Sequence, residues 1–97
     1  MEDILYYSEL YDIYKKLLTS KQQLYFEEYY FNNLSLSEIA ENYSISRNAV
    51  FNQLKIIVKY LKDYDDKLGL LAKKRYIEEI ISSNEEFVSV ESLKDLF

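Results

Sequence analysis

This sequence predicts an all-helical (all-α) fold, on three observations. The 97-residue chain has no Pro and one Gly, so it lacks the residues that punctuate an all-β protein. Apolar side chains recur every three or four positions, the period of a helix face. Two Ser/Thr-x-x-Glu/Gln strings have the form of capping boxes, which start helices by satisfying free backbone amides. A chain of this length is expected to form one domain, 1–97, around a single core.

The composition also excludes several classes of function. Without Cys or His, the chain has no disulfide framework, no cysteine nucleophile and none of the commonest metal ligand or general base. Its one glycine, Gly69, cannot supply a phosphate-binding loop. The longest apolar runs are too short to span a bilayer, and the acidic start lacks the basic flank of a secretory signal. We therefore expect a cytoplasmic protein that is not an enzyme, holds no cofactor and does not insert into membranes.

Three helices are expected in the first half of the chain. The first runs from about Ile4 to Leu18. The second begins at the capping box Thr19-Ser20-Lys21-Gln22 and stops at Asn32-Asn33, and the third begins at the capping box Ser35-Leu36-Ser37-Glu38. Their inward faces are expected to carry Tyr7, Leu10, Tyr14, Leu17, Gln22, Tyr25, Phe26, Tyr29, Leu36, Ile39, Ala40 and Tyr43.

A long helix, from Arg47 to about Leu71, dominates the second half. Its apolar residues step by four and three, which forms a heptad seam. Gly69 favours fraying or a break near the end. We expect a C-terminal helical extension over about 72–97, with a helix at Ala72 to Ser82 and a short one at Val90 to Phe97. The seam consists of Val50, Leu54, Ile57, Leu61, Tyr64, Leu68 and Leu71.

A short helix, a three-residue turn and a capped second helix make a helix-turn-helix. Its core is expected over about 19–62. Ala40 is small where the two helices cross, and Ile45 can fill the corner between them. Ser44 holds a turn position where Gly is common, and a left-handed conformation there would cost about 1 kcal/mol.

The outward face of the long helix carries the candidate binding residues. Between Arg47 and Lys62 there are four basic residues and no acidic one, although the whole chain has a net charge of −5. The first turns hold side chains that can hydrogen-bond base edges, and lysines suited to phosphates follow. A merely solvated helix face is the alternative interpretation. The candidate nucleic-acid-binding residues are Arg47, Asn48, Phe51, Asn52, Lys55 and Lys59, with Lys62 further along.

Other conspicuous residues favour ordinary structural roles. An aromatic ring at Phe51 indicates cover by a partner or by the C-terminal tail. The eleven Tyr and five Phe could stack on bases, but rings at helical spacing are more typical of a core. The acidic run at 63–66 lacks the spacing of a calcium loop, so no metal site is expected. Lys73-Lys74-Arg75 is expected to be a solvated basic turn.

Four blocks of the chain, in this order and spacing, resemble a known family. They are Leu18 to Gln22, Tyr29 to Glu41, Ser46 to Val50, and Leu61 to Leu68. Over roughly residues 7–71 the chain is similar to the YlxM family of small bacterial proteins, whose fold is similar to sigma-factor region 4. The resemblance implies a non-enzymatic accessory factor of the signal recognition particle pathway, with DNA, the particle's RNA or its GTPase as partner.

Two residues depart from the family pattern. Ile56 stands where family members usually have Arg, and Ser44 replaces the turn Gly.

Two functions stay open. One function is a regulatory module that docks the long helix on nucleic acid. The other is a protein-interaction module that binds a component of the particle, with the overall acidity discouraging DNA. Salt dependence separates them, because binding through lysines weakens steeply as salt rises.

The second half of the seam predicts a homodimer. The helix-turn-helix core needs the seam only as far as Ile57, so the remaining residues need other cover. That cover comes either from the first helix and the tail of the same chain or from a second copy. We favour the second copy, because paired units suit two half-sites on DNA. The predicted interface residues are Leu61, Tyr64, Leu68 and Leu71.

Overall fold

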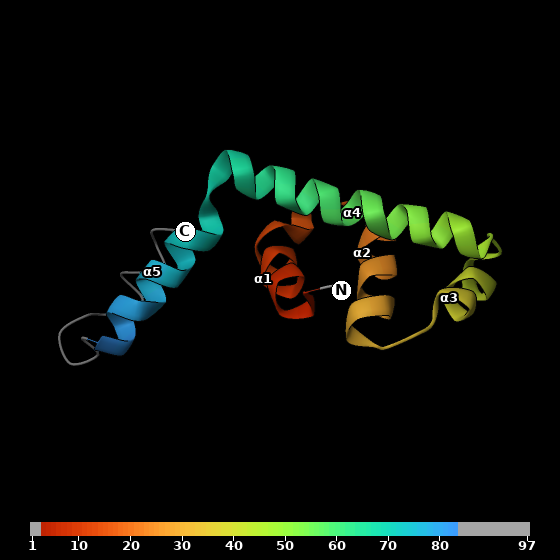
Figure 1. Ribbon diagram of the computed structural model, residues 1–97, viewed down its shortest axis with the longest axis horizontal. Helices are drawn as coiled ribbons and strands as arrows, with labels where there is room; N and C mark the ends of the chain where they lie inside the picture. Colours follow the sequence, from red (N-terminus) through yellow and green to blue (C-terminus); the bar gives the residue numbers. More distant parts are fainter. Residues whose placement is uncertain (1–2, 84–97) are drawn as a thin grey trace.

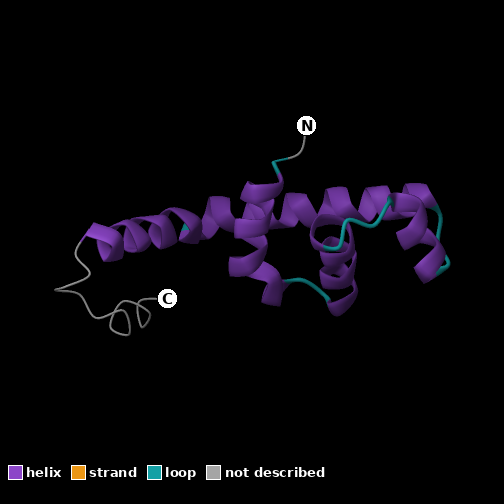
Figure 2. Ribbon diagram, turned by 90° about the horizontal axis from the view of Figure 1, so that it is seen from below, coloured by secondary structure: helices purple, strands orange, loops and turns teal. Residues whose placement is uncertain are grey.

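The computed structural model describes residues 3–83, and in this range the fold is all-helical, as predicted (Figure 1). Only helices and short loops are present there (Figure 2). The predicted helix at Val90 to Phe97 lies outside the described residues. In chain order the elements are α1 (Ile4–Tyr14), a 3-10 turn (Lys15–Leu17), α2 (Ser20–Phe26), a π-helical turn (Glu27–Phe31), α3 (Leu36–Tyr43), α4 (Arg47–Leu68) and α5 (Leu70–Ser83).

Helix α4 is the spine of the molecule. Helices α1, α2 and α3 lie along one side of it, and α5 leaves its far end at an angle (Figure 1). Four of the seam residues are buried where these helices meet α4, so the heptad spacing does mark the inner face over most of its length. The buried core consists of Leu10, Tyr11, Tyr14, Leu18, Tyr25, Phe26, Ile39, Ala40, Val50, Leu54, Ile57, Leu61 and Leu71.

Two capping boxes start helices α2 and α3 at the predicted residues. The Thr19 hydroxyl accepts from the Gln22 amide at 3.1 Å, and the Gln22 side chain accepts from the Thr19 amide at 2.9 Å. Ser35 and Glu38 form the same reciprocal pair at 3.1 and 2.9 Å. These hydrogen bonds hold the pKa of Glu38 below its ordinary value. Since each box satisfies two free amides, the starts of α2 and α3 are confirmed.

The end of the first helix differs from the prediction. Helix α1 stops at Tyr14 instead of Leu18, and the 3-10 turn that follows leaves Leu17 54% exposed. The prediction that Leu17 faces inward was therefore wrong, because a tighter turn rotates side chains away from the α-helical face. The Gln23 side chain donates to the carbonyls of Lys15 at 2.8 Å and Leu18 at 3.3 Å, which fixes this turn against α2.

Helix α2 ends in a π-helical turn that the sequence did not predict. The Asn32 amide donates to the Glu27 carbonyl at 2.9 Å, five residues back. The carboxylates of this turn accept hydrogen bonds from two tyrosines: Tyr11 of α1 donates to Glu27, and Tyr43 of α3 donates to Glu28. Burial, and then these hydrogen bonds, raise the pKa of both phenols. The widened turn thus links α1 and α3. The predicted stop at Asn32-Asn33 follows it, and Asn33 is left-handed, with a φ of 59°.

The long helix breaks at Gly69, which adopts a left-handed conformation with a φ of 63°. Helix α4 therefore ends at Leu68, three residues before the predicted end, and the break that Gly69 favoured is confirmed. The predicted helix at Ala72 to Ser82 is present, but it begins earlier, at Leu70. A left-handed residue at this position is the usual glycine termination of a helix.

A group of hydrogen bonds, which we call the clasp, joins this break to α1. The Tyr14 hydroxyl donates to the Asp65 carboxylate at 2.6 Å and accepts from the Leu70 amide at 3.2 Å. The same carboxylate oxygen accepts from the Leu71 amide at 3.1 Å. Asp65 therefore caps the start of α5. Burial and the hydrogen bond to Asp65 raise the pKa of Tyr14 to about 12.

The predicted basic turn at 73–75 is instead part of α5. Arg75 forms a two-pronged ion pair with Glu9 of α1, with Nη2 and Nε at 2.9 and 3.2 Å from the two carboxylate oxygens. This pairing lowers the pKa of Glu9 and raises that of Arg75. Arg75 thus has a structural partner and is not a free phosphate ligand.

The chain itself covers much of the second half of the seam. Leu61 and Leu71 are buried, at 0% and 3% exposure, and the half-buried Tyr64 directs its hydroxyl to the Leu17 carbonyl at 3.5 Å. Leu68, at 51% exposure, faces solvent. For Leu61 and Leu71 the cover therefore comes from the same chain, which was the alternative to a second copy, because α1 packs against both α4 and α5. The homodimer itself stays a prediction.

Candidate nucleic-acid interface

The turn between α3 and α4 fixes the direction of the candidate binding helix. Ile39 and Ala40 are buried in the crossing with α4, and Ile45 is partly buried in the corner, as predicted. Ser44 is left-handed, with a φ of 55°, and the Ile45 amide donates to the Ala40 carbonyl at 3.0 Å. The Ser46 hydroxyl then accepts from the Ala49 amide at 3.0 Å. The first turn of α4 consequently projects outward from a defined support.

The six predicted binding residues share the outer surface of α4. All of them are exposed, and they occupy the first four turns of the helix. Phe51 is 49% exposed, so no described part of the tail covers it. The residues on this surface are Arg47, Asn48, Phe51, Asn52, Lys55 and Lys59.

A groove of ≈ 480 Å³ runs beside this surface, between α4 and the helices below it. Its aromatic lining comes from Tyr7 of α1, Tyr29 and Tyr30 of the π-helical turn, and Phe51 of α4. Tyr7 and Tyr29 were predicted to face the core, whereas each is only partly buried and lines the groove. The sequence missed this site because its walls come from elements that only the fold brings together.

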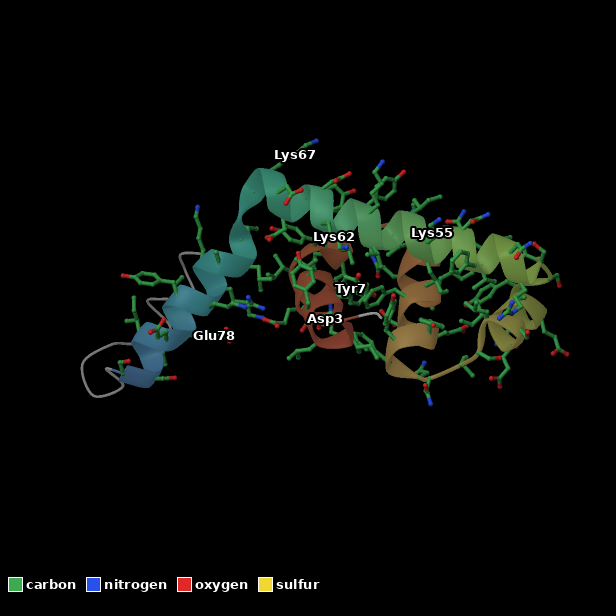
Figure 3. All side chains as sticks on the ribbon, viewed as in Figure 1. Asp3, Tyr7, Lys55, Lys62, Lys67 and Glu78 are labelled. Carbon is green, nitrogen blue, oxygen red and sulfur yellow. The ribbon has the colours of Figure 1, made fainter. Side chains whose placement is uncertain are left out.

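Lysines of α4 lie along the groove and contact its rings. The Lys55 ammonium lies 5.4 Å from the centre of the Phe51 ring, and the Lys62 ammonium lies 5.1 Å from that of Tyr7. Figure 3 shows the Lys62 and Tyr7 side chains in the space between α4 and α1. Such cation–π contacts are worth about 0.5–1 kcal/mol at exposed sites, so they orient the ammonium groups without neutralising them. Lys59 also lines this side.

The charge of α4 changes sign along its length. Asp63 and Asp66 line the groove beyond the lysines, and Asp65 belongs to the clasp. Among residues 3–83 no three acidic side chains are grouped so that they could hold a metal ion. The acidic end is therefore unfavourable for phosphates, whereas the preceding four turns favour them.

Ile56, one of the two departures from the family resemblance, is 39% exposed on α4. The surface from Arg47 to Lys62 therefore combines four cations with exposed apolar side chains.

No helix among the described residues is both long enough and apolar enough to cross a membrane.

This fold and this surface define a small helix-turn-helix protein. The family described as "Putative helix-turn-helix protein, YlxM / p13 like" (UPF0122) has a model that matches residues 1–95, and the chain belongs to this family. The match extends well beyond residues 7–71, where the resemblance lies, and it includes most of the residues after Leu71.

Relatives from several bacteria resemble the chain over most of their length. The UPF0122 protein of Geobacillus kaustophilus is 39% identical over 89 residues, which are 92% of this chain and 81% of the relative. That of Halalkalibacterium halodurans is 40% identical over 86 residues, 89% and 79% of the two chains. A Listeria welshimeri protein is 37% identical over the same length, 89% and 78%.

Proposed function

We propose that this protein is a regulatory nucleic-acid-binding module that docks the first four turns of α4 on its target. Its supporting observation is the exposure of all six candidate residues on a helix whose start is fixed by the left-handed turn at Ser44. Arg47, Asn48 and Asn52 would meet base edges, and Lys55 and Lys59 would meet phosphates.

The charge distribution supports docking through this surface alone. The whole chain carries −5, yet Arg47 to Lys62 contains four cations and no anion. A polyanion is therefore attracted to α4 and repelled by most of the remaining surface, which orients its approach. By the family resemblance, the pathway affected is that of the signal recognition particle, and the target is DNA or the particle's RNA, in the cytoplasm.

A protein partner is the second candidate, favoured by a specific observation. Phe51, Ile56 and Tyr60 are 49%, 39% and 42% exposed on α4. Exposed aromatic side chains are typical anchors of protein interfaces. A component of the signal recognition particle, such as its GTPase, would then bind this helix through apolar contacts.

The salt dependence of binding tests the proposal. Fluorescence anisotropy with a labelled DNA duplex and with signal recognition particle RNA should show affinity falling by orders of magnitude from about 50 to about 200 mM salt. Arg47→Ala and Lys55→Ala should each weaken binding while the circular dichroism stays unchanged. The control Lys16→Ala alters an exposed cation in the 3-10 turn and should bind normally. If both variants bind as well as the parent, this surface is not the site.

We further propose that the protein forms a homodimer, now through the exposed part of the seam. Leu68 is 51% exposed and Tyr64 is half-buried, so these two would make the contact with a second copy, and Leu61 and Leu71 would support them from beneath. Sedimentation over a wide concentration range tests this. Leu68→Lys should turn a dimer into a monomer, and a parent protein that stays monomeric at high concentration contradicts the proposal.

A further inference from the structure

We infer that the groove beside α4 binds an unpaired nucleobase, so that the preferred ligand is a single-stranded or unpaired segment of nucleic acid. This inference rests on the proposed function and names the ligand class for it. The observation behind it is a set of four aromatic side chains and three lysines lining one groove of ≈ 480 Å³.

The aromatic lining suits a flat, stackable ligand. The Tyr7 and Tyr30 rings are 6.0 Å apart and nearly perpendicular, as are Tyr29 and Tyr30 at 4.9 Å. Phe51 lies on the α4 side of the groove and is half exposed. Rings held in this way present faces in more than one orientation. A base can stack on such a face whatever its identity, because every base has a π-face.

The lysines give the groove a preference for a ligand with a phosphate backbone. Lys55, Lys59 and Lys62 follow each other at four and three residues, which places them along one side of α4 over about 10 Å. Lys55 and Lys62 lie 5.4 and 5.1 Å from the centres of the Phe51 and Tyr7 rings, so a base that stacks there would displace each ammonium group toward the adjoining phosphate. An apolar peptide would gain from the rings but would leave this row of cations unpaired, so the charge favours a nucleic acid.

The acidic end of the groove adds a second kind of recognition. Asp63 and Asp66 line the groove beyond Lys62. Their carboxylates repel phosphates but can accept hydrogen bonds from the exocyclic amino groups of bases. A strand would therefore keep its backbone at the lysine end and point a base toward the aspartates.

A base in a duplex cannot occupy this site, because its faces are already covered by its neighbours. The groove has the dimensions of pockets that hold small molecules, about 300–1,000 Å³, rather than those of a channel for a double helix. An unpaired base is therefore the part of a nucleic acid that fits.

The test compares single-stranded and duplex probes on the full chain. Fluorescence anisotropy would use an oligouridine, an oligothymidine, and RNA and DNA duplexes of matching length, so that ribose and deoxyribose sources are distinguished. Tyr7→Leu should weaken single-strand binding about tenfold and leave duplex binding unchanged, because Tyr7 is on α1 and outside the α4 surface. Tyr76→Leu is the matched control: Tyr76 is 64% exposed on α5, away from the groove.

A second variant protects the test from a folding defect. Phe51→Leu changes a half-exposed side chain, so it should stay folded, and it should lower single-strand affinity more than duplex affinity. Equal losses for both kinds of probe, or unchanged single-strand binding in both variants, would overturn the inference. Duplex binding without single-strand binding would also overturn it but would uphold the proposed function. A failure to bind any probe would overturn both.

Discussion

The two ends of α4 use one helix for different purposes. Over residues 47–62 the polar side chains are cationic or neutral and, except for the half-buried Gln53, they are exposed. Beyond Lys62 come three aspartates, one of which holds Tyr14 and the first turn of α5. The first end is thus available to a ligand, whereas at the second end Asp65 is already engaged by the protein's own α1 and α5.

This difference shows how a helix of 22 residues can be both an interface and a support. A charged side chain at the open end loses little by meeting a partner, because water is its alternative. One at the clasp has already exchanged water for protein hydrogen bonds, so it contributes to stability instead. Substitutions at the two ends should therefore have separable effects, on affinity at one end and on stability at the other.

The largest effect is expected from Leu61→Ala, in the buried seam between the two ends. Leu61 is fully buried, so the cavity should lower the free energy of unfolding by about 2–5 kcal/mol. Urea denaturation followed by circular dichroism measures this. If Leu61→Ala instead lowered only the oligomeric state, the residue would be part of a dimer contact and not of the core.

Tyr14→Phe should break the clasp without touching the open end. It removes a hydrogen bond to a carboxylate and the acceptor for the Leu70 amide, at an expected loss of about 1.5–3 kcal/mol in the free energy of unfolding. Nucleic-acid affinity measured on the folded protein should stay unchanged. Tyr76→Phe, at a 64% exposed position, is the control that should change neither quantity.

The clasp should also make stability fall in alkali. The pKa of Tyr14 is about 12 in the fold and about 10 in the unfolded chain, so between these values the unfolded state releases the proton first. The stabilisation is thus complete below pH about 10 and is lost as pH rises toward about 12. Urea midpoints measured across this range should fall less steeply for Tyr14→Phe than for the parent. The pKa values of Tyr11 and Tyr43 are also raised, so both proteins should lose some stability in alkali. Equal slopes of urea midpoint against pH for the two proteins would contradict the role of Tyr14.

Charge reversal at each end of α4 compares how much the two ends contribute to nucleic-acid affinity. Lys55→Glu should weaken nucleic-acid binding by about tenfold or more and flatten its salt dependence by about one unit of slope. Lys67→Glu makes the same charge change at the other end of α4, where Lys67 lies near the start of α5 (Figure 3), and should have a much smaller effect. Equal losses would mean that only the net charge matters.

The smallest effects are expected at the two left-handed positions that end α3 and α4. Ser44→Gly should raise the free energy of unfolding by up to about 1 kcal/mol, since Gly adopts a φ of 55° without strain. Gly69→Ser should lower it by a similar amount, although nothing lies within 4 Å of an added Cβ. Thermal melting of both variants measures this. A destabilising Ser44→Gly would show that the hydroxyl has a role at the turn.

The sequence predicted what is determined by neighbours in the chain. Thr19, Ser35 and Ser46 cap helices through residues three positions away, so local sequence was sufficient for the starts of α2, α3 and α4. The π-helical turn depends on hydrogen bonds from Tyr11 and Tyr43, which are 16 and 15 positions from their acceptors. No local pattern records such a partner, and for this reason that turn was missed.

The candidate site was predictable on α4 and unpredictable elsewhere. The face with Arg47 and Lys55 follows from helical geometry alone, since charges on one side of an amphipathic helix face water. Tyr7 and Tyr29, which line the groove, share their three-and-four spacing with the buried Tyr11 and Tyr25. Only the packing of α1 and the π-helical turn against α4 separates rings that line a groove from rings that fill the core.

The clasp has a consequence for the order in which the molecule opens. Its hydrogen bond between Tyr14 and Asp65 joins residues 51 positions apart, and the Arg75 ion pair spans 66. Contacts over such separations close late in folding, because a long loop must be ordered first. Among the described elements α5 packs mainly against α1, so it can detach as a unit while α2, α3 and the first turns of α4 stay folded. Hydrogen exchange should therefore reach the amides of α5 first, and the binding end keeps its shape during this partial opening.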